Sequence, residues 1–273
     1  MNYRHSFHAG NFADIIKHAT LLLVMDELRA GQTALRVVDT HAGRGRYDVG
    51  GADASRSGEA KVGIGCLAEA GDFPAAITGL RTEIAKLNPA GGIKIYPGSP
   101  ELIANRLRPG DSYLACELRA EEHSVLANTM QGRAGVKTAC VDGFQCAAEL
   151  SAFSGETFFL IDPPFERADD YAQTARTLRL VAQRSPGARF LIWLPLKDLE
   201  TFDSFVRSIE DICHGSVIIA EARMRPLADP LKMNGCVLVL VNFGKEIEAP
   251  VKDLISWVVK TLGENGEARV WRP

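Results

Sequence analysis

The sequence predicts an α/β protein in which helices cover both faces of a mostly parallel, seven-stranded sheet. Short apolar runs rich in Val, Ile, Leu and Phe alternate with longer segments at helical spacing, which is the pattern of a parallel sheet covered on both sides. Most of these runs end in or just before a charged residue or a Pro/Gly turn, as strands do. We expect a single domain over residues 1–273.

The seven predicted strands are 34–39, 112–117, 136–142, 157–162, 189–194, 216–223 and 236–243. A helix is predicted at 13–29, where apolar residues recur at helical spacing after Asn11, a suitable N-cap. The last two strands are joined by 224–235, which has several Pro, Asn and Gly residues and no helical periodicity. We therefore predict an antiparallel hairpin at the sheet edge, with the last strand antiparallel.

The segment 47–92 differs in character from the rest of the chain. A Gly-, Ala- and Ser-rich stretch is followed by two helical patterns, at 59–70 and 73–87, with no strong strand signal. A parallel crossover needs only one helix, so the second is interpreted as an insertion. We predict a small inserted helical subdomain over 47–92.

The composition excludes several classes of protein. The chain has 31 Lys and Arg against 34 Asp and Glu, a formal charge of −3, and 46% hydrophobic residues, which is the balance of an ordinary globular enzyme. We expect a cytoplasmic monomer, since no apolar run approaches a membrane span and no secretory signal is recognisable. The six cysteines form no C-x-x-C pair, so no metal site is expected. The charge balance argues against nonspecific coating of nucleic acid but permits a local basic patch.

The most specific segment is 158–165 (FFLIDPPF), an apolar strand that ends at Asp162, Pro163, Pro164 and Phe165. Two prolines fix the backbone and remove two N–H donors, which leaves carbonyl oxygens free to accept hydrogen bonds. A planar NH₂ group needs two acceptors, which the carboxylate of Asp162 and a proline-turn carbonyl can provide, and Phe165 can stack on its ring. The alternative is a strand end followed by a rigid turn.

A glycine-containing loop follows the first predicted strand, at 39–46 (DTHAGRGR). Glycines such as Gly43 let the backbone approach a ligand at the carboxyl end of the sheet, where open α/β folds bind cofactors. The spacing is not G-x-G-x-x-G, so a dinucleotide fits poorly. Asp39 and His41 are candidate polar contacts for a cofactor without phosphates; a capping acid and a surface His are the alternative.

Two further acids end predicted strands. Glu117 ends the second strand, where a carboxylate can accept both hydroxyls of a ribose. Asp142, followed by Gly143, ends the third and could accept a hydrogen bond from an adenine amine. Each alone would more often be a helix cap, but their recurrence at successive strand ends favours a nucleoside site.

This combination resembles the class I S-adenosylmethionine-dependent amino-methyltransferases, which have a Rossmann-like fold. The resemblance narrows to the RlmJ family through 3–14 (YRHSFHAGNFAD), Lys17-His18, 39–43 (DTHAG), 96–100 (YPGSP) and 142–145 (DGFQ). These motifs span nearly the whole chain in the family's order. One position departs from the family pattern, because Phe165 stands where Tyr is usual; the hydroxyl is lost and the stacking face is kept.

The resemblance implies an enzyme that uses S-adenosylmethionine to methylate N6 of one adenine in domain V of bacterial 23S ribosomal RNA. It also implies a role for particular residues. His18, His41, Ser99, Glu117, Asp142 and Gly143 would line the cofactor pocket, Asp162 would be the catalytic acceptor, and Tyr3 would contact the target adenosine. Two of these have plain alternatives, since Ser99 opens a predicted helix and could be only its cap, and Asp14, Lys17 and His18 could be a surface triplet.

The first eighteen residues carry Arg4, His5, His8, Lys17 and His18 against a single acid, Asp14. We therefore predict that Arg4 and Lys17 contact RNA phosphates, with Arg44 and Arg46 extending the patch. A basic terminus without function is the alternative. The inserted helices could help to grip RNA, although they show no aromatic or basic stripe.

The residues predict a direct in-line transfer with no covalent enzyme intermediate. Asp162 and the proline turn would orient and polarise N6 while Phe165 holds the base. Three other functions stay open at this point. A DNA adenine-N6 or protein glutamine methyltransferase would use the same kind of clamp, an rRNA-binding ribosome-assembly factor would lack activity, and a dehydrogenase would not bind S-adenosylmethionine.

Overall fold

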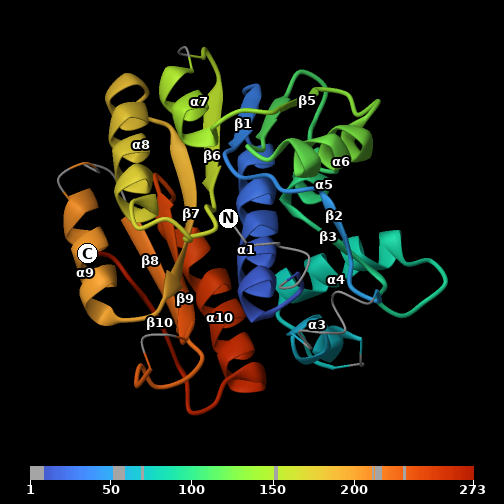
Figure 1. Cartoon of the computed structure of the whole chain (residues 1–273), viewed down its shortest axis with the longest axis vertical. Coiled ribbons are helices and arrows are strands. Elements are labelled where there is room, and N and C mark those ends of the chain that lie inside the picture. The colour runs from blue at the N-terminus through green and yellow to red at the C-terminus, as the bar shows by residue number, and fades with distance from the viewer. Residues whose placement is uncertain are drawn as a thin grey trace.

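The computed structural model describes residues 9–51, 59–68, 71–150, 153–210, 212, 217–229 and 232–273. Its centre is an eight-stranded sheet in the order β10-β8-β9-β7-β6-β1-β4-β5, with helices on both faces (Figure 1). The neighbours β6-β1-β4-β5 and β6-β7 are parallel, whereas β9 is antiparallel to β7 and β8, and β10 is antiparallel to β8. The predicted α/β fold with a mostly parallel sheet is confirmed.

The strands are β1 (Leu35–Asp39), β4 (Ser112–Cys116), β5 (Val136–Ala139), β6 (Glu156–Ile161), β7 (Arg189–Leu196), β8 (Val217–Arg223), β9 (Gly235–Val241) and β10 (Glu267–Trp271). All seven predicted strands are present within a few residues of their predicted ends. The predicted number is wrong, because β10 adds an eighth strand. Its sequence, EARVW, has only half-buried or exposed side chains, so it lacks the apolar run by which the other strands were identified.

The predicted hairpin is correct as an antiparallel pair of β8 and β9 but wrong as the sheet edge. β9 lies between β7 and β8, with all seven of its residues buried, and β10 covers the outer side of β8. Glu221 of β8 is completely buried and forms ion pairs with Arg223 and with Arg269 of β10. A buried carboxylate needs such partners, and β10 therefore supplies Glu221 with a second cation besides Arg223 of its own strand.

The helices are α1 (Phe12–Ala30), α3 (Glu59–Val62), η2 (Ile64–Leu67), α4 (Ala75–Leu87), α5 (Ser99–Ala104), α6 (Ala120–Met130), α7 (Gly143–Glu149), α8 (Asp170–Arg184), α9 (Leu199–Glu210), η3 (Lys245–Ile247) and α10 (Glu248–Leu262). One core cluster joins the sheet to α7, α8 and α9 through residues such as Phe144, Leu178 and Phe205. The other joins its opposite face to α1, α5, α6 and α10. The two clusters are the two sides of a three-layer fold.

The helix α1 is enclosed on several sides. Asn11 is its N-cap, as predicted, and its side-chain oxygen accepts the N–H groups of Ala13 and Asp14 at 3.0 and 3.1 Å. Residues of α1 pack with α4, α5 and α10 (Figure 1). This enclosure buries polar as well as apolar residues of α1, among them Asp14, Lys17 and His18. Among the helices that the structure describes, none has the length and apolar character needed to cross a bilayer.

The segment between β1 and β4 contains more than the sequence predicted. Two three-residue strands, β2 (Arg46–Asp48) and β3 (Ile95–Pro97), form a small antiparallel ribbon at its two ends. The helix predicted at 59–70 is divided into α3 and η2, and α4 begins two residues later than predicted. Ile77, Leu80 and Ile84 of α4 belong to the same core cluster as α1. Whether 47–92 is a subdomain with stability of its own stays a prediction.

We expect Ile77→Ala to lower the free energy of unfolding of the whole chain by about 2–4 kcal/mol, because Ile77 is completely buried against α1 and its loss leaves a cavity. Urea denaturation followed by circular dichroism measures this. Thr82→Ala, at an exposed position of the same helix, is the control and should change stability by less than about 0.5 kcal/mol. A separate early transition in Ile77→Ala, with the main transition unchanged, would instead indicate an independent subdomain.

Candidate active site

A cavity of about 360 Å³ opens at the carboxyl ends of β1, β4 and β6, where open α/β sheets bind their ligands. The structure brings most of the predicted site residues to its wall: Lys17, His18, His41, Gly43, Ser99, Glu117, Asp142, Gly143, Asp162, Pro163, Pro164 and Phe165. Asp39 lies directly beneath it, in contact with Ser99. Tyr3 and Arg4 lie outside the described residues.

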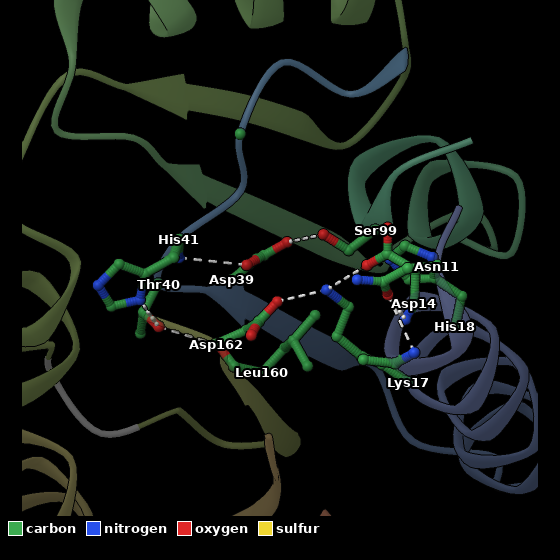
Figure 2. A network of polar contacts seen from close by, with 12 residues as sticks. Asn11, Asp14, Lys17, His18, Asp39, Thr40, His41, Ser99, Leu160 and Asp162 are labelled. Atoms are coloured by element: carbon green, nitrogen blue, oxygen red, sulfur yellow. Dashed lines mark hydrogen bonds and ion pairs between the residues drawn. The ribbon is translucent and has the colours of Figure 1, made fainter. Parts of the chain in front are cut away.

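The acidic residue of the D-P-P-F motif is held by a lysine from α1. Asp162 follows β6, and its Oδ2 lies 2.5 Å from Lys17 Nζ, which is also 2.9 Å from Asp14 Oδ1 (Figure 2). Burial alone would lower the pKa of Lys17, but the carboxylates of Asp14 and Asp162 raise it well above its ordinary value. Lys17 therefore stays a cation, and it fixes the position of the Asp162 carboxylate.

These contacts change the interpretation of the first turns of α1. Asp14, Lys17 and His18 are all buried, so the surface-triplet alternative is wrong. Lys17, which was predicted to contact RNA phosphate, has its ammonium group enclosed between two carboxylates. His18 Nδ1 lies 2.8 Å from the hydroxyl oxygen of Tyr96, which is completely buried. The polar face of α1 thus forms a wall of the cavity.

The proline turn and the aromatic residue that follows it line the cavity. Among the described residues, none donates a hydrogen bond to the carbonyl of Pro163 or Pro164. Phe165 has φ of 50°, a left-handed conformation that is uncommon for a bulky side chain and recurs at functional sites. Its ring packs at 4.7 Å from Tyr171 and 5.8 Å from Trp193, measured between ring centroids. The motif therefore combines a carboxylate, carbonyl acceptors and an aromatic surface.

Asp39 organises the loop after β1 from below the cavity. Its Oδ2 accepts hydrogen bonds from the hydroxyls of Ser99 at 2.7 Å and Tyr113 at 3.2 Å, and its Oδ1 accepts one from the main-chain N–H of His41 at 3.3 Å. Complete burial raises the pKa of Asp39 to about 6, against the lowering effect of Ser99. The N-cap of α5 is Gly98, so Ser99 is not the helix cap that the alternative reading required.

His41 is a neutral group in the cavity wall. Burial lowers its pKa to about 4, so it is uncharged at neutral pH. Its Nδ1 lies 2.8 Å from Thr40 Oγ1, and its ring meets Phe144 edge to face at 4.7 Å. The alternative of a surface His is wrong, since these contacts hold the ring between the loop after β1 and α7.

A hydrogen bond between Gly43 and Glu117 connects the loop after β1 to the loop after β4. Gly43 has φ of 62°, and a Cβ there would lie 2.2 Å from the hydroxyl of Tyr47, so the tight turn requires glycine. Its N–H donates to Glu117 Oε2 at 3.0 Å, and Arg119 N–H donates to Oε1 at 2.8 Å. Burial raises the pKa of Glu117. Each of its oxygens retains a second lone pair for a ligand.

Asp142 and Gly143 begin α7 at the opposite wall. Asp142 is the N-cap of α7, and its Oδ1 accepts the N–H of Gln145 at 3.1 Å. A Cβ at Gly143 would lie 1.8 Å from the carbonyl oxygen of Thr40. Glycine is therefore required for α7 to pack against the loop after β1. The capping alternative is correct for Asp142, and the cofactor roles of both residues stay predictions.

The predicted basic extension of the site is neutralised. Arg44 pairs with Glu122 at 2.5 Å, and Arg46 pairs with Glu101 at 2.9 Å. The sequence gives no sign of either pairing, because both carboxylates lie on helices, α6 and α5, that begin more than fifty residues further along the chain. Both arginines thus brace the loop after β1 through ion pairs, and Glu101 is shared between Arg46 and Arg133, which lies 2.6 Å from its other oxygen.

Several residues that line the cavity were not predicted from the sequence. Tyr47, Leu118, Trp193, Lys197 and Met233 all reach the cavity. Leu118 directly follows Glu117 and could have been found as an apolar residue at a strand end. Trp193 lies inside the apolar run of β7 and is indistinguishable there from a core residue. In the described part of the chain, no group of three His, Cys, Asp or Glu side chains has an arrangement suited to a metal ion.

The raised pKa of Asp39 predicts a pH-dependent contribution to stability. Between its unfolded value near 3.8 and its folded value of about 6, the folded state binds more protons, so this contribution is full at low pH and is lost as pH rises through 6. In Asp39→Asn it is absent. We expect the wild-type chain to gain stability relative to Asp39→Asn as pH falls from 7.5 to 5, measured by urea denaturation. His41 titrates in both proteins, so its contribution to the pH dependence cancels in the difference between their unfolding free energies. A difference that does not vary with pH would contradict the assignment.

Comparison with known proteins gives a consistent result. The model of the family described as ribosomal RNA large subunit methyltransferase D, RlmJ, matches residues 32–272. Ribosomal RNA large subunit methyltransferase J of Haemophilus influenzae is 31% identical over 97% of this chain and 95% of its own length. Its counterpart of the same name in Escherichia coli K12 is 29% identical over 96% and 94%. The crystal structure of LPL1258 from Legionella pneumophila is similar with a TM-score of 0.89, 25% identity and coverage of 97% and 98%.

Proposed function

Since the chain belongs to the RlmJ family of ribosomal RNA large subunit methyltransferases, we propose that it methylates the N6 amine of one adenine in domain V of 23S ribosomal RNA with S-adenosylmethionine as cofactor. The observation that supports this proposal is the position of Asp162. Its carboxylate lies in the wall of the cavity, beside two unpaired proline carbonyls and the ring of Phe165. This arrangement suits a planar amine with two hydrogens to donate.

The cavity suits the proposed cofactor in charge, shape and donor chemistry. When bound, S-adenosylmethionine supplies a methyl group from a positively charged sulfur. Seven acidic residues against four Lys and Arg line the cavity, which favours a cation. Glu117 would accept the ribose hydroxyls, Asp142 would accept a hydrogen bond from the adenine amine, and the half-exposed side chain of Leu118 offers an apolar surface to the ring. The close turn at Gly43 leaves room for that ligand.

The clamp at Asp162 would act on the nitrogen itself. The lone pair of an adenine N6 is delocalised into the ring, so the amine is a poor nucleophile until the nitrogen becomes more tetrahedral. Hydrogen bonds from its two N–H groups to Asp162 and to the carbonyl of Pro163 or Pro164 favour that change. A carboxylate is too weak a base to deprotonate a neutral amine, so Asp162 would accept the proton only after N6 has been methylated.

Lys17 is a positioning residue in this proposal. Its ammonium engages only one oxygen of Asp162, Oδ2, which leaves Oδ1 to accept an N–H of the amine. Asp14 holds Lys17 from the other side at 2.9 Å. Asp14 and Lys17 are buried, and the side chain of Asp162 is only 16% exposed. The three side chains therefore have little freedom to rotate, and the carboxylate is oriented before the substrate arrives.

The target adenine must leave its stack to reach Asp162. Unstacking costs a few kcal/mol and is easiest in a loop or an irregular segment of RNA. Phe165 would face the extruded base, supported by Tyr171 and Trp193. The contribution of Tyr3 and Arg4 to substrate binding is part of the proposal and rests on the family resemblance alone.

We expect Asp162→Ala to lower methyl transfer to 23S rRNA by about 10²–10⁴-fold, since it removes the acceptor that orients N6. Calorimetry should show that S-adenosylmethionine still binds. Asp203→Ala, which removes an exposed acid on α9, is the control and should retain full activity. Undiminished N6-methyladenosine in rRNA treated with Asp162→Ala would contradict the mechanism. Radiolabelled transfer to RNA, DNA and protein in parallel separates the proposed substrate from the alternatives.

Substitutions of Phe165 test the stacking role. Phe165→Tyr keeps the ring and should retain activity within about threefold, whereas Phe165→Ala should raise the KM for rRNA by roughly 10–100-fold, the usual loss for removing one stacking partner. Steady-state kinetics with saturating cofactor measure both. Equal activity of Phe165→Ala and the wild type would show that the ring does not hold the base.

A further inference from the structure

A second hollow, of about 400 Å³, lies beside the active-site cavity and is not explained by the methyl-transfer chemistry. It runs between α7 and α8, which lie side by side on one face of the sheet (Figure 1). Asp142, Phe144 and Arg167 line both the cavity and this hollow. The two spaces are therefore adjacent, and a strand at the mouth of the cavity lies next to the groove between α7 and α8.

One side of the groove is formed by a single stripe of α8. Gln173, Arg176, Thr177, Leu180 and Arg184 line it, at the spacing of three and four residues that places side chains on one helical face. Arg176 and Arg184 are eight residues apart, so their attachment points are separated by about 12 Å along the helix. The polar side chains between them are neutral, and the two guanidinium groups are the only charges of this stripe.

Arg176 and Arg184 carry charges that no ion pair in the described ranges neutralises. Both side chains are exposed, and within the described ranges neither has a carboxylate at ion-pair distance. Most other arginines on this protein are paired, as Arg44, Arg106 and Arg133 are. The net charge of the chain is −3, yet Arg176 and Arg184, two cations without an ion-pair partner in the described ranges, line a groove next to the active site.

Two carboxylates, those of Asp142 and Glu149, also line the groove. Asp142 is the N-cap of α7, and Glu149 accepts a hydrogen bond from the side-chain amide of Gln145 at 2.8 Å. Arg167, at the junction with the cavity, pairs with Asp169 at 2.9 Å. With that pair set aside, two cations and two carboxylates line the groove, whereas acids exceed basic residues by seven to four in the cavity. The groove therefore lacks the excess of negative charge that the cavity has.

We propose that the groove between α7 and α8 binds the phosphate backbone of the RNA strand next to the target adenine, through Arg176 and Arg184. This inference rests on the proposed function and extends it to the path of the substrate. Guanidinium groups are well suited to phosphate, and phosphate contacts fix the register of a strand without reading its sequence. The groove offers no exposed aromatic ring among its lining residues, so it would hold the backbone and leave the bases to the cavity.

The test compares two double variants with the same net charge. Arg176→Ala/Arg184→Ala removes the two cations of the groove. Arg179→Ala/Arg207→Ala removes two exposed arginines that also lack ion pairs in the described structure and do not line the groove, one on α8 and one on α9. Both are assayed with protein-free 23S rRNA from cells that lack this protein. Filter binding gives the Kd at several salt concentrations, and radiolabelled methyl transfer gives KM and kcat.

We expect the groove variant to raise the Kd and KM for rRNA by about tenfold and to leave kcat within about twofold, because phosphate contacts position the strand before the reaction. The slope of log Kobs against log salt should become shallower by about 1.4, for two phosphates at roughly 0.7 each on a single strand. The control variant should match the wild type. Arg176→Lys/Arg184→Lys should restore most of the binding, since lysine keeps the charge.

Two outcomes would overturn the proposal. One is a Kd and salt slope of the groove variant equal to those of the wild type. The other is an equal loss in the control variant, which would show a general effect of surface charge. A chain that binds rRNA through these arginines but transfers no methyl group would support the groove and contradict the proposed function, so the two failures are distinguishable.

Discussion

The ion pair between Lys17 and Asp162 is the constraint on which the site depends. It joins α1 to the end of β6, two elements that are 145 residues apart in sequence, through side chains that are 7% and 16% exposed. A charge removed from water to this degree is stable only with a partner in good geometry. Lys17 has two, because Asp14 approaches it from within α1. The position of α1 relative to β6 is thus coupled to the electrostatics of the cavity.

This coupling explains why α1 is so completely covered. An ion pair near the surface would be screened and mobile, whereas α4, α5 and α10 exclude water from the three sides of α1 that do not face the cavity. The same burial acts on Asp39, whose pKa is raised to about 6 by desolvation and, to a lesser degree, by the nearby charge of Asp162. Neutral hydroxyl donors, from Ser99 and Tyr113, stabilise Asp39 where no cation reaches it. The fold therefore places one lysine at the acid that is proposed to react and only neutral donors at the acid that organises the loop.

The sequence predicted the fold class, and twelve of the residues predicted for the site line the cavity, because both depend on local patterns. Apolar runs marked seven strands, and the acids that follow β1, β4, β5 and β6 had to meet at one edge of a parallel sheet. What escaped prediction depends on contacts between distant segments. The edge strand β10 has no apolar run and is stabilised by pairing with β8, and the strands β2 and β3 are three residues long and pair across 46 positions of chain.

Predictions of charge failed for a related reason. Lys17 was expected at a basic surface because Asp14 is the single acid among the first eighteen residues, and Arg44 and Arg46 were expected to extend that surface. Lys17 pairs with this Asp14 and with Asp162, and the two arginines pair with Glu122 and Glu101, so that three of the four partners lie far along the chain. Arg176 and Arg184 were not predicted to bind RNA, because their helix has the pattern of an ordinary amphipathic segment. Their side chains line a groove only because α7 packs beside α8.

The excess of acids in the cavity, which the groove between α7 and α8 lacks, also bears on how the substrate would be selected. A strand of RNA carries its negative charges on the backbone, and the excess of acids in the cavity repels them. A nucleobase is neutral and presents N–H groups that carboxylates and carbonyls accept. On our proposal, an extruded adenine would enter the cavity while the phosphates that flank it stay at Arg176 and Arg184 of α8. The cavity would then admit the base and exclude the backbone, as a transfer to N6 requires.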